Sequence, residues 1–340
     1  MTRPDGASAR RRLATPRIEY RPLHPAHALP ADLLAAVVFG EAYARHDDPR
    51  CVRVGLEPLA GPGVAELWHA AGAVRIGFDG PLRYAADAAH LAGAIELDER
   101  DFADLEATAR AAYAALRRFQ QQSEYPHLLR VWNYFDGINR GSGDEERYKQ
   151  FCLGRAQGLE VGSASRLPAA TAIGRRDGST ILQVYWLAGR SPGVPLENPR
   201  QLSAYRYPRE YGSHAPVFSR ATLLRQKDSL TLFISGTASI VGHRSIHVGD
   251  TAAQTRETLA NIAALLEEAN RVERAARFSL GSLACKVYVR RPQDLPVIRA
   301  ELAAALEPTS KVIYLQADIC RQDLLVEIEA TGMCPLKADA

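Results

Sequence analysis

The chain has 340 residues, of which 46% are apolar and 24% charged, and its net charge is +3. This length is enough for two or three domains, and the composition is that of an ordinary soluble globular protein. Part of the positive charge comes from Arg3 and Arg10–Arg12, in a stretch without aromatic side chains that could stack on bases. We therefore predict a disordered tail over residues 1–15 and no nucleic-acid partner.

The cysteines and histidines give no sign of a metal site. Five scattered cysteines form no CxxC pair, and nine histidines form no HExxH motif, so we expect neither a metal nor a cofactor. Unpaired thiols of this kind are typical of a reducing cytoplasm. The longest apolar run near the start, Leu33–Gly40, is too short to cross a bilayer. We predict a cytoplasmic protein without membrane contact.

An N-terminal segment over residues 16–62 precedes the first complete unit. It contains strand-like stretches at Arg17–Leu23, Leu33–Phe39 and Cys51–Leu59. Glycines at both ends of Gly61–Gly63 break the pattern, and we place a domain boundary there.

A central domain over residues 63–195 follows. One apolar stripe of its first helix is formed by Phe102, Leu105, Ala109, Ala112 and Leu116. Asp144 is the predicted N-cap of its second helix. In chain order we expect the strand Val74–Gly80, the helix Asp98–Phe119, the strand Leu128–Ile138, the helix Asp144–Leu159, and a hairpin of Ala169–Gly174 with Thr180–Gly189.

A C-terminal domain over residues 196–340 repeats this succession. Within it, Val326 and Ile328 alternate with Glu327 and Glu329, so the two carboxylates share one face of a strand. We predict an α+β fold with two mixed sheets, each with two helices packed on one face. The elements are the strand Ser229–Gly242, the helix Asp250–Asn270 capped by Asp250, the strand Leu283–Arg291, the helix Leu295–Leu306, and the strands Lys311–Cys320 and Leu324–Ala330.

Several short motifs of this last unit occur in the order found in one family. They are Ser235-Gly236, Ala253-Gln254, Leu259-Ala260-Asn261 and the closing VEIEA of residues 326–330. The unit resembles the RidA (YjgF) family, which has a chorismate-mutase-like fold and forms trimers with sites between subunits. The resemblance implies tandem RidA-like domains that form an intrachain pseudo-trimer, and we expect a monomer.

Three longer stretches narrow the resemblance. Arg130–Leu159, Asn198–Gly212 and the C-terminal module, in this order, are similar to the chorismatase family, in particular its 3-hydroxybenzoate synthase type. The resemblance implies that chorismate is cleaved to 3-hydroxybenzoate and pyruvate, in a cleft between the central and C-terminal domains.

Chorismate is a dicarboxylate, and arginine binds carboxylates in a bidentate way. Arg147 and Arg155 lie eight residues apart on one predicted helix, which places them about 80° apart around its axis and about 12 Å apart along it. Both can therefore face one cleft. Tyr207 and Arg290 are further candidate substrate-binding residues. The alternative is that Arg147 and Arg155 are solvated, with Arg147 paired to neighbouring glutamates.

Release of pyruvate begins best by protonating the methylene of the enol ether, which requires an acid. By resemblance this acid is Glu327, the first glutamate of VEIEA, and its pKa should be raised by burial. Glu329 on the same face is the alternative, and both side chains can also simply face solvent.

The product depends on two further positions. Within the family that the chain resembles, the hydrolytic type has Ala at the positions of both Gly236 and Cys320. The type that forms 3-hydroxybenzoate has Gly and Cys at these positions. Gly236 and Cys320 therefore favour cleavage without net water addition. Other outcomes stay open: hydrolysis to a dihydroxycyclohexadiene carboxylate, mixed 3- and 4-hydroxybenzoate, a RidA-type imine hydrolase, or a ligand-binding module without catalysis. The alternative is that Gly236 is a turn glycine and Cys320 a buried cysteine, neither with a part in the reaction.

Overall fold

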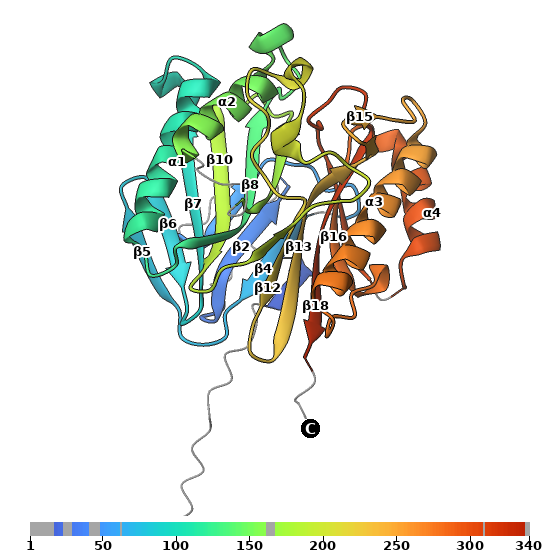
Figure 1. Ribbon diagram of the computed structural model, residues 1–340. Coiled ribbons are helices and arrows are strands. Elements are labelled where there is room, and N and C mark those ends of the chain that lie inside the picture. Colours follow the sequence, from blue (N-terminus) through green and yellow to red (C-terminus); the bar gives the residue numbers. More distant parts are fainter. Residues whose placement is uncertain are drawn as a thin grey trace, which may run out of the picture.

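The computed structural model describes residues 17–22, 29–40, 48–61, 63–160, 167–308 and 310–336. The predicted disordered tail over residues 1–15 lies outside this range. Three mixed sheets pack against one another, with helices on the outer side of two of them (Figure 1). No helix in the part of the chain described here has the length and apolar character needed to cross a membrane.

The first sheet belongs to the N-terminal segment. Its order is β1-β4-β2-β3, and only β2 and β3 pair in parallel. Every residue of β2 is buried. Because β4 pairs with both β1 and β2, the sheet extends past the predicted boundary between residues 62 and 63. The strands are β1 (Arg17–Arg21), β2 (Leu33–Phe39), β3 (Cys51–Val54) and β4 (Val64–His69).

The central sheet has the order β5-β6-β7-β10-β8-β9, with one parallel pair, β8 and β9. Helices α1 and α2 cover one face of it (Figure 1). The elements are β5 (Arg75–Asp79), β6 (Leu82–Ala86), β7 (His90–Asp98), α1 (Leu105–Gln122), β8 (His127–Asp136), α2 (Arg147–Leu159), β9 (Ala169–Arg175) and β10 (Ile181–Gly189).

The C-terminal sheet repeats this plan in the order β11-β12-β13-β18-β16-β17, again with one parallel pair, β16 and β17. Its first strand begins at Val194, so the predicted boundary after residue 195 cuts through β11. The elements are β11 (Val194–Leu196), β12 (Ala221–Arg225), β13 (Ser229–Ala238), α3 (Thr251–Val272), β16 (Leu283–Val289), α4 (Leu295–Ala305), β17 (Lys311–Gln316) and β18 (Val326–Pro335), with a small ribbon of β14 (Ile240–Val241) and β15 (Arg244–Ser245).

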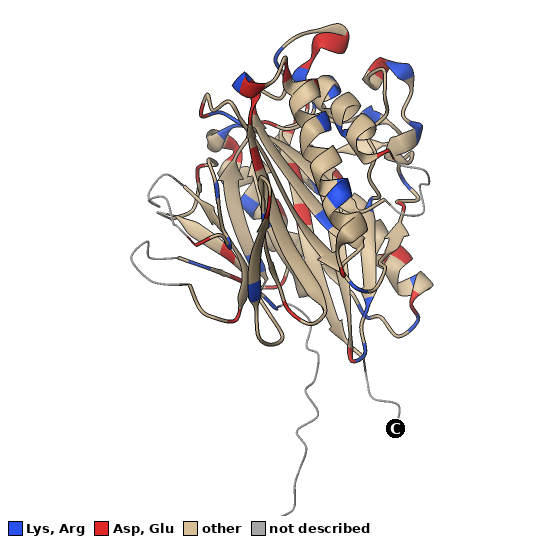
Figure 2. Ribbon diagram, turned by 90° about the vertical axis from the view of Figure 1, so that its left-hand side faces the viewer, with Lys and Arg blue, Asp and Glu red and all other residues tan. Residues whose placement is uncertain are grey.

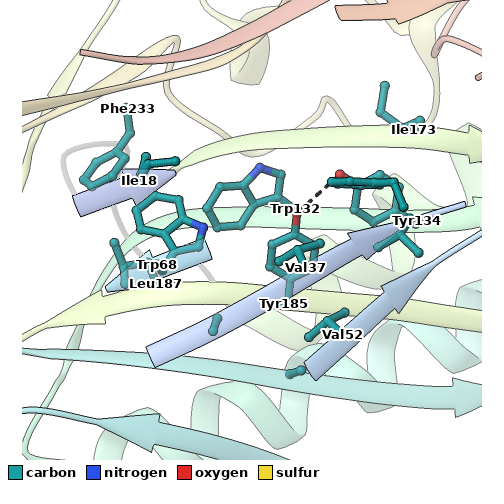
Figure 3. Packing of buried hydrophobic residues seen from close by; sticks show 14 of the residues in the cluster. Ile18, Val37, Val52, Trp68, Trp132, Tyr134, Ile173, Tyr185, Leu187 and Phe233 are labelled. Atoms are coloured by element: carbon teal, nitrogen blue, oxygen red, sulfur yellow. Dashed lines mark hydrogen bonds between the residues drawn. The ribbon is translucent and has the colours of Figure 1, made fainter. Parts of the chain in front are cut away.

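The identical strand order of the two six-stranded sheets confirms the predicted α+β class and the predicted tandem arrangement of two related units. The first sheet repeats four strands of the same plan, so the chain is a pseudo-trimer. All three units meet in one apolar core that includes Trp68, Trp132, Tyr185 and Phe233 (Figure 3). The rings of Trp132 and Tyr185 stack with centroids 4.6 Å apart.

Helix α2 can approach α1 closely because it has glycines where the two helices touch. A Cβ on Gly154 would lie 2.1 Å from the carbonyl oxygen of Glu106, and one on Gly158 would lie 2.6 Å from that of Arg110. The predicted N-cap of α2 is wrong. Asp144 lies in a 3₁₀ turn and pairs with Arg209, and α2 begins only at Arg147.

The predicted hairpin of the central unit is also wrong. Strand β10 lies between β7 and β8, whereas β9 pairs only with β8 and forms an edge of the sheet. This edge contacts the C-terminal unit. The N–H groups of Ala169 and Ala170 donate to Thr222 Oγ1 and Ser235 Oγ, at 2.8 and 2.9 Å. The local turn at Gly178 exists, with φ of 69°, but the sequence cannot show that the connection crosses over β8.

The predicted cap of α3 is confirmed, because Asp250 accepts a hydrogen bond from the N–H of Ala253 at 2.9 Å. We expect Asp250→Ala to lower the free energy of unfolding by about 1 kcal/mol in urea denaturation. Glu267→Ala removes an exposed carboxylate from the same helix without touching the cap, and should change stability by less than about 0.5 kcal/mol. Equal losses in the two variants would contradict this assignment of the cap.

Candidate active site

A cavity lies between the central and C-terminal units, with an empty volume of about 860 Å³ including its mouth to solvent. Helix α2 and strand β9 form one side, and β13, β18 and the segment before β18 form the other. The segment between β11 and β12 adds two tyrosines, Tyr207 and Tyr211. The lining residues are Glu146, Tyr148, Lys149, Phe151, Cys152, Arg155, Ala170, Thr171, Ala172, Tyr207, Tyr211, Pro216, Phe218, Arg220, Gly236, Ala238, Ile240, Cys320, Arg321 and Glu327.

Glu327 reaches this cavity because of the alternation predicted for β18. Val326 and Ile328 pack under the helices of the C-terminal unit, so Glu327 points the other way. Its side chain is buried, and the residue is only 4% exposed. Burial raises the pKa of the Glu327 carboxyl to about 8; the charge of Glu329 adds to the rise and Arg130 opposes it. A carboxyl of this kind is protonated at neutral pH.

Glu329 faces the same side of β18 in a different environment. Its carboxylate accepts hydrogen bonds from Arg130 Nη2 at 2.8 Å and Trp132 Nε1 at 2.7 Å, and lies 2.7 Å from Lys286 Nζ. Burial acts to raise the pKa of Glu329, but the charges of Lys286 and Arg130 outweigh it and hold that pKa below its ordinary value. Glu329 is therefore an ionised partner in a buried ion-pair cluster.

Gly236 on β13 lies directly against the acid. A Cβ at this position would lie 2.0 Å from Glu327 Oε1 and 3.1 Å from Thr171 Cγ2. Its φ is not in the left-handed region, so the backbone conformation does not require glycine. The close approach of the Glu327 carboxyl requires it instead, and a larger residue here must displace the acid.

Cys320 lines the cavity near the same carboxyl. Burial, and then the charge of Glu327, raise the pKa of the Cys320 thiol far above its ordinary value. The group is therefore a neutral S–H, a weak hydrogen-bond donor and not a nucleophilic thiolate. Cys152 and Tyr148 face the cavity from α2 and are likewise neutral, because burial raises the pKa of each.

Of the two arginines predicted on α2, the structure brings only Arg155 to the cavity. It is 4% exposed, its Nε and Nη2 groups have no hydrogen-bond partner in the described part of the chain, and its guanidinium lies 5.2 Å from the ring centre of Tyr113. Arg147 instead forms a bidentate pair with Glu99 at 2.6 and 3.0 Å and donates to the carbonyl of Asp136. Helical spacing alone did not reveal this competing partner.

Arg290 does not line the cavity either. Its guanidinium donates to the carbonyls of Leu324, Ile319 and Arg321. It also contacts Asn139 and Asp318, at 3.1 and 2.9 Å. These bonds fix the segment between β17 and β18, which carries Cys320. The structure thus assigns Arg290 a supporting place behind the cavity wall.

Tyr207 lies at the cavity as predicted, and two arginines that the sequence analysis missed accompany it. Arg220, buried just before β12, donates to the Tyr207 hydroxyl at 2.7 Å and leaves its Nε without a partner among the described residues. The Arg321 guanidinium lies 4.1 Å from the ring centre of Tyr211. Arg321 directly follows Cys320 in the sequence, and this adjacency was the one available signal; nothing local distinguishes Arg220.

The fold and cavity together define a class: a chain of tandem α+β units with an acid and arginines between two of them. A family model described as "Chorismatase FkbO/Hyg5-like, N-terminal" matches residues 66–188. Two proteins of Streptomyces hygroscopicus are each 41% identical to the chain: a chorismatase, with 78% of each chain covered, and a 3-hydroxybenzoate synthase, with 66% of this chain and 68% of that one covered. A chorismatase crystal structure superposes with a TM-score of 0.83 at 34% identity, covering 94% of this chain and all of the other.

The chain belongs to the chorismatase family.

The contrast between Arg155 and Arg147 gives a test of site against scaffold. We expect Arg147→Met to lower the free energy of unfolding by about 1–3 kcal/mol, because it leaves the Glu99 carboxylate without its partner. Arg155→Met removes a buried charge with unpaired donors and should leave the free energy of unfolding unchanged or higher. Urea denaturation of both variants measures this. A loss in Arg155→Met as large as in Arg147→Met would show that Arg155 serves the fold.

Proposed function

We propose that this protein is a chorismatase that cleaves chorismate to 3-hydroxybenzoate and pyruvate without net addition of water. The observation that carries the proposal is Glu327: a buried carboxyl, protonated at neutral pH, at the wall of a cavity that also holds arginines with free donors. Sequence identity to a 3-hydroxybenzoate synthase over two thirds of the chain supports the product.

In this proposal the reaction begins with a proton. Glu327 donates its proton to the methylene carbon of the enolpyruvyl group, which leaves positive charge on the ether carbon. The bond between the ring and the ether oxygen then breaks, and that oxygen leaves as the ketone of pyruvate. The ring hydroxyl oxygen forms a bond to the vacated ring carbon and its bond to the neighbouring ring carbon breaks, so the hydroxyl moves by one position. Loss of the proton on the carbon that received the hydroxyl restores aromaticity. The Glu327 carboxylate is the base available for that proton, so protons and atoms balance.

Three features favour this outcome over hydrolysis. The cavity walls include the apolar side chains of Phe151, Phe218 and Ile240, which offer water few partners. The lack of a side chain at Gly236 lets the Glu327 carboxyl lie directly against β13. The neutral thiol of Cys320 is placed to hydrogen-bond to a ring oxygen or pass a proton. Gly236 and Cys320 are therefore proposed as the residues that set the product.

Arginines hold the two carboxylates in this proposal. Arg155 offers Nε and Nη2 from α2, and Arg220 offers Nε from the C-terminal unit. The Tyr207 hydroxyl accepts from Arg220 and keeps its own proton to donate to the substrate. Arg321 adds a further positive charge at the mouth. Arg147 and Arg290 are left out of this set, because other groups of the protein occupy their donors.

We expect Glu327→Gln to abolish pyruvate release from chorismate, because an amide cannot protonate carbon. In the unaltered enzyme, kcat/KM should be constant below neutral pH and fall as the pH rises through about 8, where the Glu327 proton is lost. A coupled pyruvate assay over a pH series measures both effects. Near-normal activity of Glu327→Gln would remove the acid role, and activity on an imine but not on chorismate would favour the hydrolase alternative.

We expect Cys320→Ala and Gly236→Ala each to shift the products away from 3-hydroxybenzoate while pyruvate is still released. The first removes a hydrogen-bonding thiol, and the second displaces the Glu327 carboxyl from its position against β13. Chromatography of the aromatic and cyclohexadiene products measures the ratio. Cys152→Ala, at a second neutral thiol in the same cavity, is the matched control. An unchanged ratio in both variants would make these positions bystanders.

A further inference from the structure

A buried cluster of charges joins all three units directly behind Glu327. Lys286 on β16 lies 2.7 Å from Glu329 on β18 and 2.7 Å from Glu66 on β4. Arg130 on β8 pairs with Glu329 at 2.8 Å. These four residues are between 1% and 3% exposed, so solvent does not compensate their charges. In a molecule whose charges otherwise lie mostly on helices and connecting segments (Figure 2), such a cluster within strands requires a reason.

The charges of the cluster balance without Glu327. Lys286 and Arg130 supply two positive charges, and Glu66 and Glu329 supply two negative charges. Glu327 precedes Glu329 by two residues on the same face of the strand, at a spacing of about 7 Å. Ionising it would add a third carboxylate to a buried group that has only two cations.

The same cluster also fixes the position of the acid. The Nη2 group of Arg130 donates both to Glu329 and to Thr171 Oγ1. Thr171 Oγ1 in turn accepts the N–H of Gly236 at 2.9 Å. Gly236 is the residue against which the Glu327 carboxyl lies. The cluster therefore holds the backbone that defines where the proton is presented.

We propose that Glu329 is a positioning residue which keeps the proton on Glu327, and that Glu66 of the N-terminal sheet takes part through Lys286. This proposal rests on the proposed function of Glu327 as general acid. It assigns a purpose in the reaction to a unit none of whose described residues lines the cavity.

Other charged and titratable groups around Glu327 do not replace this effect. The Arg290 donors are taken by carbonyls and Asp318, and Arg220 is held by Tyr207 and the carbonyl of Leu202. Burial holds the pKa values of Tyr148, Cys152 and Cys320 above their ordinary range, so these three groups stay neutral. The charges that act on Glu327 are those of Glu329 on β18, Arg130 on β8, Arg290 after β16 and Arg220 before β12. The other titratable groups of the cavity wall are Glu146 before α2, Tyr148, Lys149, Cys152 and Arg155 on α2, Tyr207 and Tyr211 between β11 and β12, and Cys320 and Arg321 before β18.

The test is the pH at which kcat/KM for pyruvate release from chorismate begins to fall. Glu329→Gln leaves the cluster with one excess positive charge, which favours ionised Glu327. The fall should move to lower pH by at least one unit, so that activity drops about twofold at neutral pH and about tenfold above the original fall, and returns on acidification. Glu66→Gln should act in the same direction with a smaller shift, because Glu66 contacts Glu329 only through Lys286.

A variant with the opposite charge imbalance in the cluster sharpens the test. Lys286→Met leaves an excess negative charge and should move the fall to higher pH, whereas Glu329→Gln with Lys286→Met restores balance and should return it close to the starting value. Glu99→Gln, which breaks the half-buried Arg147 pair outside the cluster, is the matched control and should not move it. A merely structural role predicts lower activity in the cluster variants at every pH, with the fall unmoved.

The outcomes separate the two proposals. If the unaltered protein releases no pyruvate from chorismate at any pH, the proposed function fails. If it does, but Lys286→Met and Glu66→Gln leave the position of the fall unchanged, the role of the cluster is overturned even where Glu329→Gln does not fold.

Discussion

The rest of the structure depends on two carboxyls on one face of β18, those of Glu327 and Glu329. Only the charge of Glu329 is compensated by neighbouring cations. Burying an ionised carboxylate is costly unless cations and hydrogen bonds surround it. At Glu329 the protein provides Lys286, Arg130 and an indole N–H; at Glu327, two residues earlier, it provides none of them. The same strand therefore carries one permanent anion and one neutral acid. That difference supplies a proton where an enol ether needs one, without a metal or a cofactor in the proposed reaction.

The pseudo-trimer explains how one chain builds this contrast. The outer faces of the two larger sheets are covered by their helices, so their inner faces meet each other and the N-terminal sheet in a shared core (Figure 1). Large aromatic side chains such as Trp68 and Trp132 pack together in that core (Figure 3). The ion-pair cluster lies beside it, with one charged residue from the N-terminal unit, one from the central unit and two from the C-terminal unit. Strand β9, an edge of the central sheet, closes the seam next to the acid.

Much of this could be predicted from the sequence, and the remainder has definite physical reasons. Periodicity predicted both helix pairs and the alternation that separates Glu327 from Val326. Periodicity could not show that β9 and β10 do not pair with each other, because the partner of a strand depends on side chains in another unit, such as Thr222 and Ser235. Spacing on α2 placed Arg147 and Arg155 toward one side, but the choice between cavity and salt bridge is made by Glu99, which is 48 residues away. Arg220 has no local signal at all.

The central claim is that Glu327 holds a proton at neutral pH in the folded protein before any substrate binds. Infrared difference spectroscopy of the wild-type protein against Glu327→Gln tests it directly, through the carbonyl stretch of a protonated carboxyl. We predict that this band is present at neutral pH and disappears as the pH rises through about 8. A spectrum without the band at neutral pH, with only carboxylate absorption assigned to Glu327, would contradict the account.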